Sequence, residues 1–441
     1  MVGEALLAQL AQDSFVARLG RVRRILPTYV EADGPAAPLG ALCAIETRGA
    51  ADAAAWAVAE VVGVQADAVV LAPLDAAAGV FPGARVLALS EAARAPVGEG
   101  LLGRAVDALG RPIDGGRPID GLDDARLDAA PAPALDRLSP TERLETGVRA
   151  IDALLTLAKG QRVGLFAASG VGKTTLLTQL ANQVAADVCV ICLVGERGRE
   201  VEHLWAHGLP EAARRRTVLV AATSDQPAAL RARACSYAAA IADHWRDRGA
   251  HVLLVVDSVT RYAMALREIG LAAGEPPTVR AYTPGVFAAL PRLVEACGAV
   301  RGRGAITAIF TVLSETDDVD DPISEAMRSI LDGHILLSRE LAEQGHFPAI
   351  DVPRSVSRLA RAVQPAAERA RAARALSLLS TYEAARTLIE TGVYRAGADP
   401  QIDAAVEARG RLLQFLRQDV DLHVAPAAAA IALTDALGAA A

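Results

Sequence analysis

The sequence has few aromatic residues and no excess of positive charge. Phe, Trp and Tyr make up 4% of its 441 residues, so Ala, Val and Leu must supply most of the core. Proteins that bind single-stranded nucleic acids stack bases on exposed rings, which this chain has little means to provide. Its formal net charge is -7, whereas general nucleic-acid binding needs clustered positive charge. We therefore predict that no nucleic acid is among its partners.

Cysteine is also scarce. The five cysteines are scattered and odd in number, which indicates a reducing compartment without a disulfide framework. Cys189 and Cys192 form a C-x-x-C, but the surrounding run "DVCVICLVG" is typical of a buried strand. Residues three apart on a strand point to opposite faces, so we predict core cysteines rather than a redox or zinc site. His203 and His207 lie one helical turn apart without a third ligand nearby, and we predict no metal there.

Long apolar runs are missing as well. A membrane-spanning helix needs about 20 predominantly apolar residues, and no stretch of the chain resembles one. The N-terminal stretch "MVGEALLAQLAQDSFVARLG" has neither the basic start nor the apolar run of a signal peptide. We therefore expect a cytoplasmic protein.

The first part of the chain predicts a helix followed by a β-barrel. Residues 1–19 have apolar residues at helical spacing, and this helix either packs on the next domain or docks a partner. Residues 20–95 contain short β-rich runs broken by Gly, Pro and Asp segments, such as "LCAIET" and "AVVLAPL". Regularly spaced short strands of this kind are typical of a small barrel.

The remainder predicts an α/β core and a helical domain. Residues 96–365 begin with a Gly- and Pro-rich segment that we interpret as a surface linker, and then alternate apolar strands with helical stretches. Near-continuous aliphatic runs such as "HVLLVVDS" and "AITAIFTVLS" indicate strands buried on both faces of a parallel sheet. Residues 366–441 contain helical patterns only. The predicted fold class is thus α/β, with a small N-terminal barrel and a C-terminal helical domain.

Residues 167–174, "AASGVGKT", resemble a phosphate-binding loop of the form G-x-x-x-x-G-K-[ST], with Ala167 in place of the first glycine. A strand leads into this stretch and a helix leaves it, so backbone N–H groups and the helix N-terminus can bind phosphate oxygens. Alanine fits the first position if its φ is negative. The predicted nucleotide-binding residues are Ala168, Ser169, Gly170, Val171, Gly172, Lys173, Thr174 and Thr175, with Thr174 also a magnesium ligand.

Two acidic positions complete a candidate hydrolytic site. Asp257 ends the apolar strand "HVLLVVDS", where a carboxylate is expected to hold magnesium through water, although a helix N-cap is the alternative. Glu196, in "VGERGRE", follows another strand and is placed to deprotonate an attacking water. Glu200 is predicted to hold a magnesium-bound water, and Arg197 to pair with carboxylates or phosphates.

Six motifs along the chain together resemble the type III secretion and flagellar export ATPases. They are "GVRAID", "GLFAASGVGKT", "GERGRE", "DSVTRYAMALREIGLAAGEPP", "LDGHILLSRELAEQGHFPAID" and "SVSR". These are relatives of the catalytic subunits of rotary ATP synthases. The resemblance runs from "GRVRRI" to "ETGVYRAGADPQID". It implies a RecA-like ATPase core between the barrel and the helical domain, and a homohexamer at the base of an export apparatus.

The same resemblance implies individual roles. Lys173 matches the phosphate-binding lysine, Glu196 the general base and Asp257 the magnesium aspartate. Arg197 matches an arginine beside the base, and Arg261 matches an active-site arginine. Phe347 matches an aromatic that packs on adenine, and Arg358 matches an arginine finger that reaches a neighbouring subunit.

The predicted function is therefore hydrolysis of ATP with Mg²⁺ in a protein export apparatus, peripherally associated with the inner-membrane export gate. Implied partners are an export regulator, a stalk protein, chaperones and exported proteins. "VEADGPAAPLGALC" and "TRYAMALREIG" favour the flagellar over the injectisome system. The alternatives are a rotary ATP synthase subunit, an RNA-translocating ring helicase, and a subunit that binds nucleotide without hydrolysis. Rotary ATP synthase subunits normally have an acidic "DELSEED"-type segment, and none is found after residue 366.

Overall fold

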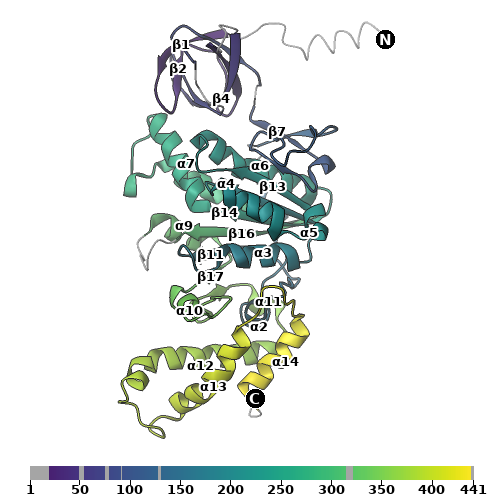
Figure 1. Ribbon diagram of the computed structural model, residues 1–441, viewed down its shortest axis with the longest axis vertical. Coiled ribbons are helices and arrows are strands. Elements are labelled where there is room, and N and C mark those ends of the chain that lie inside the picture. Colours follow the sequence, from purple (N-terminus) through teal and green to yellow (C-terminus); the bar gives the residue numbers. More distant parts are fainter. Residues whose placement is uncertain are drawn as a thin grey trace.

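The computed structural model describes residues 19–48, 54–74, 79–90, 92–127, 131–313 and 321–438. Figure 1 shows a barrel, an α/β core and a group of C-terminal helices stacked along the longest axis. The helix expected over residues 1–19 lies outside this part of the chain, apart from its last residue. None of the helices in the described ranges combines the length and the apolar character needed to cross a lipid bilayer.

The barrel is closed and has the strand order β1-β2-β5-β4-β3-β6, as the sequence predicted. Its interior is filled by aliphatic and small side chains such as Val30, Ile45 and Leu71, each at most 1% exposed. This composition agrees with the low aromatic content, because a small barrel leaves little room inside. The strands are β1 (Leu19–Ile25), β2 (Val30–Ala32), β3 (Leu42–Arg48), β4 (Ala54–Val64), β5 (Val69–Pro73) and β6 (Arg85–Ala88).

The core contains the predicted sheet, in the order β18-β17-β11-β16-β14-β12-β13-β8. Its strands are parallel except for β18, which pairs antiparallel with β17. A short strand pair, β10 (Arg137–Leu138) and β15 (Gly298–Val300), joins β16. The main strands are β8 (Ala105–Val106), β11 (Arg162–Ala167), β12 (Val188–Val194), β13 (Thr217–Ala222), β14 (His251–Asp257), β16 (Ala305–Leu313), β17 (Gly333–Leu336) and β18 (Val356–Ser357).

The segment interpreted as a surface linker has more structure than expected. Its strand β8 pairs with β13 at the edge of the sheet, and both of its residues, Ala105 and Val106, are buried. The neighbouring strands β7 (Arg94–Val97) and β9 (Asp123–Arg126) form a separate two-stranded ribbon. Burial of the two apolar residues of β8 thus overrides the Gly and Pro content around them.

Helices cover both faces of the sheet, and each face has its own core. Figure 1 shows α6 (Ala228–Arg246) and α7 (Val259–Ala272) on the barrel side, and α3 (Lys173–Gln183) on the side of the C-terminal helices.

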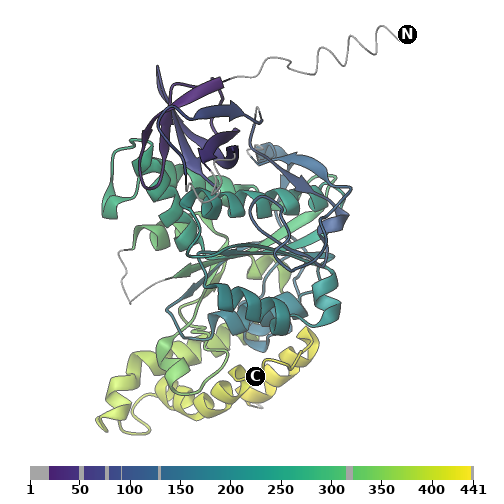
Figure 2. The same ribbon diagram turned by 45° about the horizontal axis from the view of Figure 1, so that its top comes forward.

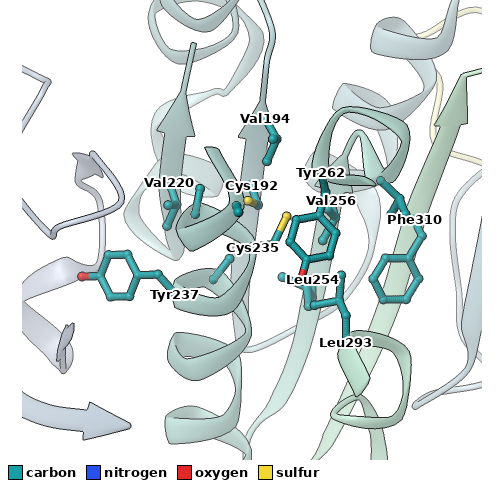
Figure 3. Close-up of a cluster of buried hydrophobic side chains, with 14 of the residues drawn as sticks. Cys192, Val194, Val220, Cys235, Tyr237, Leu254, Val256, Tyr262, Leu293 and Phe310 are labelled. Atoms are coloured by element: carbon teal, nitrogen blue, oxygen red, sulfur yellow. The ribbon is translucent and has the colours of Figure 1, made fainter. Parts of the chain in front are cut away.

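Figure 3 shows Cys192 of β12 and Cys235 of α6 among the side chains of the barrel-side core. Cys189 belongs to the core on the opposite face. The five cysteines are free and buried, which confirms that the C-x-x-C is part of the core.

The barrel-side core also includes α8 and α9, as well as Ala72 and Leu74 from the barrel end. Figure 2 shows the sheet between its two helical layers. The further helices of the core are α2 (Arg149–Leu154), α4 (Gly198–His203), α5 (Glu211–Arg215), α8 (Pro284–Glu295), α9 (Pro322–Ile330), α10 (Arg339–Glu343) and α11 (Ala360–Val363). The short helical turns are η1 (Glu99–Leu101), η2 (Ala134–Asp136), η3 (Leu204–Gly208) and η4 (Val279–Ala281).

Three C-terminal helices pack against α2 and share the core that contains α3. They are α12 (Ala366–Glu390), α13 (Pro400–Leu416) and α14 (Pro426–Leu437). Asp399 caps α13 by accepting a hydrogen bond from the backbone N–H of Gln401, and Pro400 stands at the first helical position. Buried alanines such as Ala375, Ala408 and Ala429 line the contacts. Their small side chains let the helices approach closely.

A buried arginine connects the barrel to the core. Arg233 of α6 has 2% of its side chain exposed and pairs with Glu60 of β4 at 3.1 Å. Its Nε donates to the carbonyl of Ala108 at 3.2 Å, and Nη2 donates to the carbonyl of Arg94. Burial raises the pKa of the Glu60 carboxyl, while the charge of Arg233 opposes that rise. The Glu60 side chain is 21% exposed, so water has limited access to this carboxylate and hardly any to Arg233.

We expect Arg233→Met to lower the free energy of unfolding by about 3–5 kcal/mol, because it leaves Glu60 buried without its partner. Urea denaturation measures this loss. Arg231→Met is the matched control on the same helix, since Arg231 pairs with Glu268, which is 41% exposed, and more exposed pairs contribute about 0–1 kcal/mol. Equal losses in the two variants would contradict the prediction.

Candidate nucleotide-binding and catalytic site

The phosphate-loop sequence connects strand β11 to helix α3, and its glycines permit the turn. Gly170 and Gly172 have φ values of 82° and 89°, where a Cβ would be strained. In the described part of the chain, the only non-glycine residues with positive φ are Arg280 and Ala281. Ala167 therefore has the negative φ that its Cβ requires. Ala167 is 1% exposed, and its methyl group packs in the core beneath the loop. The departure from the glycine pattern therefore costs the loop no backbone strain.

A lysine and two carboxylates meet at the carboxyl ends of the strands. Lys173, the first residue of α3, contacts the Oδ1 of Asp257 and lies 3.5 Å from the Oε1 of Glu196. Asp257 ends β14 and Glu196 follows β12, which is its neighbour in the sheet. Thr311 of β16, the neighbour of β14 on its other side, donates its hydroxyl to Asp257 Oδ1 at 2.7 Å. Segments that are up to 138 positions apart in the sequence, from 173 to 311, thus converge on Asp257.

The environment of Glu196 suits a proton acceptor that works near neutral pH. Burial and the negative charge of Asp257 raise the pKa of Glu196 to about 7, while Lys173 opposes this rise. A general base is most effective when its pKa lies near the working pH. The geometry and the pKa therefore both fit the predicted role, which stays a prediction.

The oxygen atoms near Asp257 fit magnesium. Thr174 follows Lys173, whose amine contacts Asp257, so the hydroxyl and the carboxylate come from neighbouring positions at the same edge of the sheet. The small cavity of about 20 Å³ beside them has an apolar lining and is not itself a metal site. Mg²⁺ prefers hard oxygen ligands and usually binds through one or two carboxylates, waters and the phosphates of the substrate. The rings of His203 and His207 lie 5.5 Å apart, and among the described residues no third His, Cys, Asp or Glu side chain is grouped with them.

The other predicted polar residues lie around Glu196. Glu200 is in the first turn of α4 and pairs with the largely exposed Arg197 at 3.9 Å. Its role as a magnesium ligand stays a prediction. Arg261, in the first turn of α7, packs so closely on Gly195 that a Cβ there would lie 3.1 Å from its side chain. Its buried Nε makes no hydrogen bond to the described residues. The glycine before Glu196 therefore makes room for Arg261 beside this carboxylate.

Phe347 lies against the phosphate loop. Two of its ring carbons are 3.4 and 3.5 Å from the position that a Cβ of Gly172 would occupy. The residue is 47% exposed, so part of the ring remains open to contact. The structure thus brings the predicted adenine-stacking residue to the border of the predicted phosphate site, although the two are 175 positions apart in the sequence (347 − 172).

Arg358, in contrast, lies at the opposite end of the strands. Its backbone N–H donates to the carbonyl of Asp332, and Asp332 pairs with Arg162 at the amino end of β11. The phosphate loop follows the carboxyl end of β11, about five residues or roughly 16 Å further along the strand. The guanidinium of Arg358 donates to the carbonyl of Arg328 on α9, which packs on the barrel-side face of the sheet, away from α3. Arg358 therefore points away from the phosphate loop of its own chain.

Two residues of the site region were missed by sequence reasoning. Thr311 is a polar residue near the end of the apolar run "AITAIFTVL", and this break in the pattern was a usable signal. Gln418 contacts the loop that carries Phe347, and its sequence surroundings gave no sign of that contact. The first is locally visible in the sequence, whereas the second depends on long-range packing.

Comparison with known proteins gives two matching families. Residues 147–357 match the ATP synthase alpha/beta family, nucleotide-binding domain. Residues 364–435 match the T3SS EscN ATPase C-terminal domain. The first match includes the phosphate loop, both carboxylates and Phe347, and the second begins just before α12.

Relatives of known name match along most of their length. A flagellum-specific ATP synthase of Bacillus subtilis (strain 168) is 46% identical over 404 residues, which cover 92% of each protein. The SPI-2 type 3 secretion system ATPase of Salmonella typhimurium is 45% identical over 404 residues, which cover 92% of this chain and 91% of the relative. Flagellar and secretion ATPases are thus similar to this chain to the same degree.

Solved structures agree with this result. The assembled ATPase EscN from the type III secretion system of enteropathogenic E. coli has a TM-score of 0.89 and 40% identity, covering 95% of this chain and 100% of that one. EscN in complex with its central stalk EscO has a TM-score of 0.85 and 39% identity, with the same coverage.

Proposed function

The chain belongs to the type III secretion and flagellar export ATPases of the ATP synthase alpha/beta family, and from this we propose how its residues hydrolyse ATP. The backbone of residues 168–175 and Lys173 bind the phosphates. Phe347 stacks on the adenine. Thr174 and Asp257 would hold magnesium, and the bound ion would supply positive charge at the phosphate oxygens. The experiments below test these assignments residue by residue.

In the proposed reaction, Glu196 accepts a proton from a water molecule, whose oxygen then attacks the γ-phosphorus. The bond from that phosphorus to the bridging oxygen of ADP breaks, and the ADP oxygen leaves with the bond electrons. Lys173 stabilises the negative charge that develops on the phosphate oxygens. Thr311 orients Asp257 through its 2.7 Å hydrogen bond. Arg261, packed on Gly195 beside Glu196, is placed to interact with the transferred phosphate.

The observation that carries the proposed assembly is the position of Arg358. An arginine that stabilises the transferred phosphate is worth about 10³–10⁵ in rate in other phosphoryl-transfer enzymes. Arg358 lies at the end of the strands opposite to its own phosphate loop, next to Asp332. We therefore assign it to the site of a neighbouring copy in a homohexamer. EscN, a relative, has been solved in an assembled form, which supports this assignment.

This assembly makes the specific activity depend on protein concentration. We expect ATP turnover per subunit to rise steeply as dilute subunits associate, because each site gains the arginine of its neighbour. Measurement of turnover over a range of concentrations, with the oligomeric state followed by light scattering, tests the proposal. The Arg358→Ala variant is the control and should assemble without the rise in turnover. A wild-type monomer with full turnover would contradict the homohexamer.

We further propose that the ring contacts a stalk protein, an export regulator, chaperones and exported proteins in the cytoplasm, peripherally at the inner-membrane export gate. EscN has been solved with its central stalk, which supports the first of these partners. The flagellar system is the one favoured by the sequence. Copurification tests both points, since rod or hook proteins would support a flagellar system and effectors with their chaperones would identify an injectisome. Stimulation of the ATPase by RNA would instead favour a ring helicase.

A further inference from the structure

Three distant segments meet in a hydrogen-bonded junction directly behind Phe347. They are residues 147–149 at the start of α2, residues 346–347 of the predicted adenine loop, and residues 417–424 between α13 and α14. The third segment belongs to the C-terminal helices and the other two to the nucleotide-binding core. Contacts between these segments therefore join the helical domain to the nucleotide site.

Gln418 is the centre of this junction. Its Nε2 donates to the carbonyls of Gly147 at 2.7 Å and Leu422 at 2.6 Å, and its Oε1 accepts from the backbone N–H of Arg149 at 2.8 Å. Its own backbone N–H donates to the carbonyl of Phe347 at 3.0 Å. The residue is 7% exposed, so water offers little replacement for these bonds. Loss of this buried amide would leave the backbone N–H of Arg149 without its partner, while the carbonyls of Gly147 and Leu422 would keep only their bonds from Val424 and Gln183.

Neighbouring contacts hold the adenine loop in the same place. His346 is 1% exposed, and Arg417 Nε donates to its Nδ1 at 3.4 Å. Burial and the charges of Arg417 and Arg409 lower the pKa of His346 to about 4, so the ring stays neutral and able to accept this bond at neutral pH. His346 and Phe347 are thus both hydrogen-bonded to the segment after α13.

The junction also touches the helix that begins at the phosphate loop. Gln183, the last residue of α3, donates through Nε2 to the carbonyls of Val420 at 3.2 Å and Leu422 at 3.4 Å. A Cβ at Gly147 would lie 2.5 Å from atoms of both Gln183 and His423, so the three segments are in close contact there. Displacement of residues 417–424 cannot leave the adenine loop unaffected, because Gln418 bonds to both.

We infer that Gln418 is a positioning residue for adenine: its side chain fixes residues 417–424 so that its backbone N–H holds Phe347 against the phosphate loop. The inference rests on the proposed adenine role of Phe347. It assigns to the junction a part in ATP affinity, through which the position of the C-terminal helices alters how tightly the base is bound. Lys173 and Glu196 are not part of the junction, so the chemical step is expected to remain largely intact.

The test compares full-length Gln418→Ala, Phe347→Ala and the double variant at one protein concentration. Each single variant should raise the KM for ATP about tenfold, which is within the range for loss of one base–ring stack. The kcat should change by less than about threefold, because the groups at the reacting phosphate are retained. The double variant should add less than about twofold, because both changes remove the same contact.

Two controls separate positioning from general stability. Gln364 is also 7% exposed and donates from Nε2 to the carbonyl of Ala153 at 3.2 Å and the hydroxyl of Thr156 at 2.6 Å. Its side-chain bonds are to Ala153 and Thr156 and not to Phe347, so Gln364→Ala should lower the melting temperature without raising the KM. Inorganic tripolyphosphate, which has no base, should inhibit wild type and Gln418→Ala equally. Gln418→Glu, which keeps the acceptor but loses both donors, replaces Gln418→Ala if that variant does not fold.

An unchanged KM in the Gln418 variant beside a raised KM in Phe347→Ala would overturn the positioning role alone. Additive effects in the double variant, or weaker inhibition by tripolyphosphate, would overturn it as well. An unchanged KM in Phe347→Ala would remove the proposed adenine contact, and the positioning role with it. The two proposals therefore fail in different ways.

Discussion

Arg358→Ala is expected to lower ATP turnover by about 10³-fold or more while leaving nucleotide affinity within a few-fold of wild type. The reason is geometric, since the guanidinium reaches the carbonyl of Arg328 on α9 and not the phosphate loop of its own chain. Its removal therefore leaves the nucleotide contacts of each subunit intact. Equilibrium binding of ATP and steady-state turnover, measured on the same preparation, separate the two effects.

A mixing experiment tests whether the arginine acts on a neighbour. Lys173→Ala removes the phosphate lysine but keeps Arg358, whereas Arg358→Ala does the reverse. In a mixed ring, an interface that pairs the intact arginine of one variant with the intact lysine of the other is complete, because head-to-tail interfaces join different surfaces. At equal amounts, about a quarter of the interfaces should be complete. Activity that returns on mixing supports action in trans, and two inactive variants that remain inactive in mixed rings would rule it out.

Arg354→Ala is the matched control for Arg358. Arg354 lies four residues earlier, is 64% exposed in its side chain and pairs with Asp351 at 3.8 Å. Loss of an exposed ion pair costs about 0–1 kcal/mol of stability. Its turnover should therefore stay close to that of wild type. A loss equal to that of Arg358→Ala would mean that this edge of the sheet is needed for assembly and not for catalysis.

Glu196→Gln is expected to bind ATP and to hydrolyse it about 10²–10⁴ times more slowly, which is the usual contribution of a positioned proton acceptor. The amide has the shape of the carboxyl but cannot take the proton of the attacking water. Its neutral charge also removes one of the two negative groups near Lys173. Binding should therefore be retained or strengthened.

Single-turnover hydrolysis of bound ATP measures the chemical step without interference from product release. Glu202→Gln is the control, since Glu202 lies in helix α4, which begins just after Glu196, but is exposed and forms no ion pair with Lys173. It should retain wild-type turnover. Near-normal hydrolysis by Glu196→Gln would mean that another group activates the water.

The sequence predicted the elements of this fold well because its strands differ clearly in pattern. Barrel strands such as β1 and β3 mix polar with apolar residues and are separated by turn residues, whereas the core strands β12 and β14 are unbroken, almost wholly aliphatic runs buried on both faces. β8 escaped prediction because a two-residue strand in a Gly- and Pro-rich segment has no periodicity to detect. Its burial is set by pairing with β13, which lies more than a hundred residues later in the chain.

The site was predictable to the extent that strand ends determine it. Asp257 and Glu196 each follow an apolar strand, and the carboxyl ends of parallel strands meet at one edge of the sheet. The direction of Arg358 was not visible in the sequence, because it depends on the antiparallel pairing of β18 with β17. The bonds of Gln418 were hidden for a similar reason, since they link positions up to 271 residues apart.

The two cores on the two faces of the sheet have a mechanical consequence. The barrel is anchored to one face through Arg233 and the core around α6, and the C-terminal helices are anchored to the other face together with α3. A force applied to the C-terminal helices is thus transmitted first to α3 and the loop at its start, while the sheet shields the barrel from it. Such a molecule can keep its barrel stationary in an assembly and still convert strain at its far end into a change at the phosphate-binding loop.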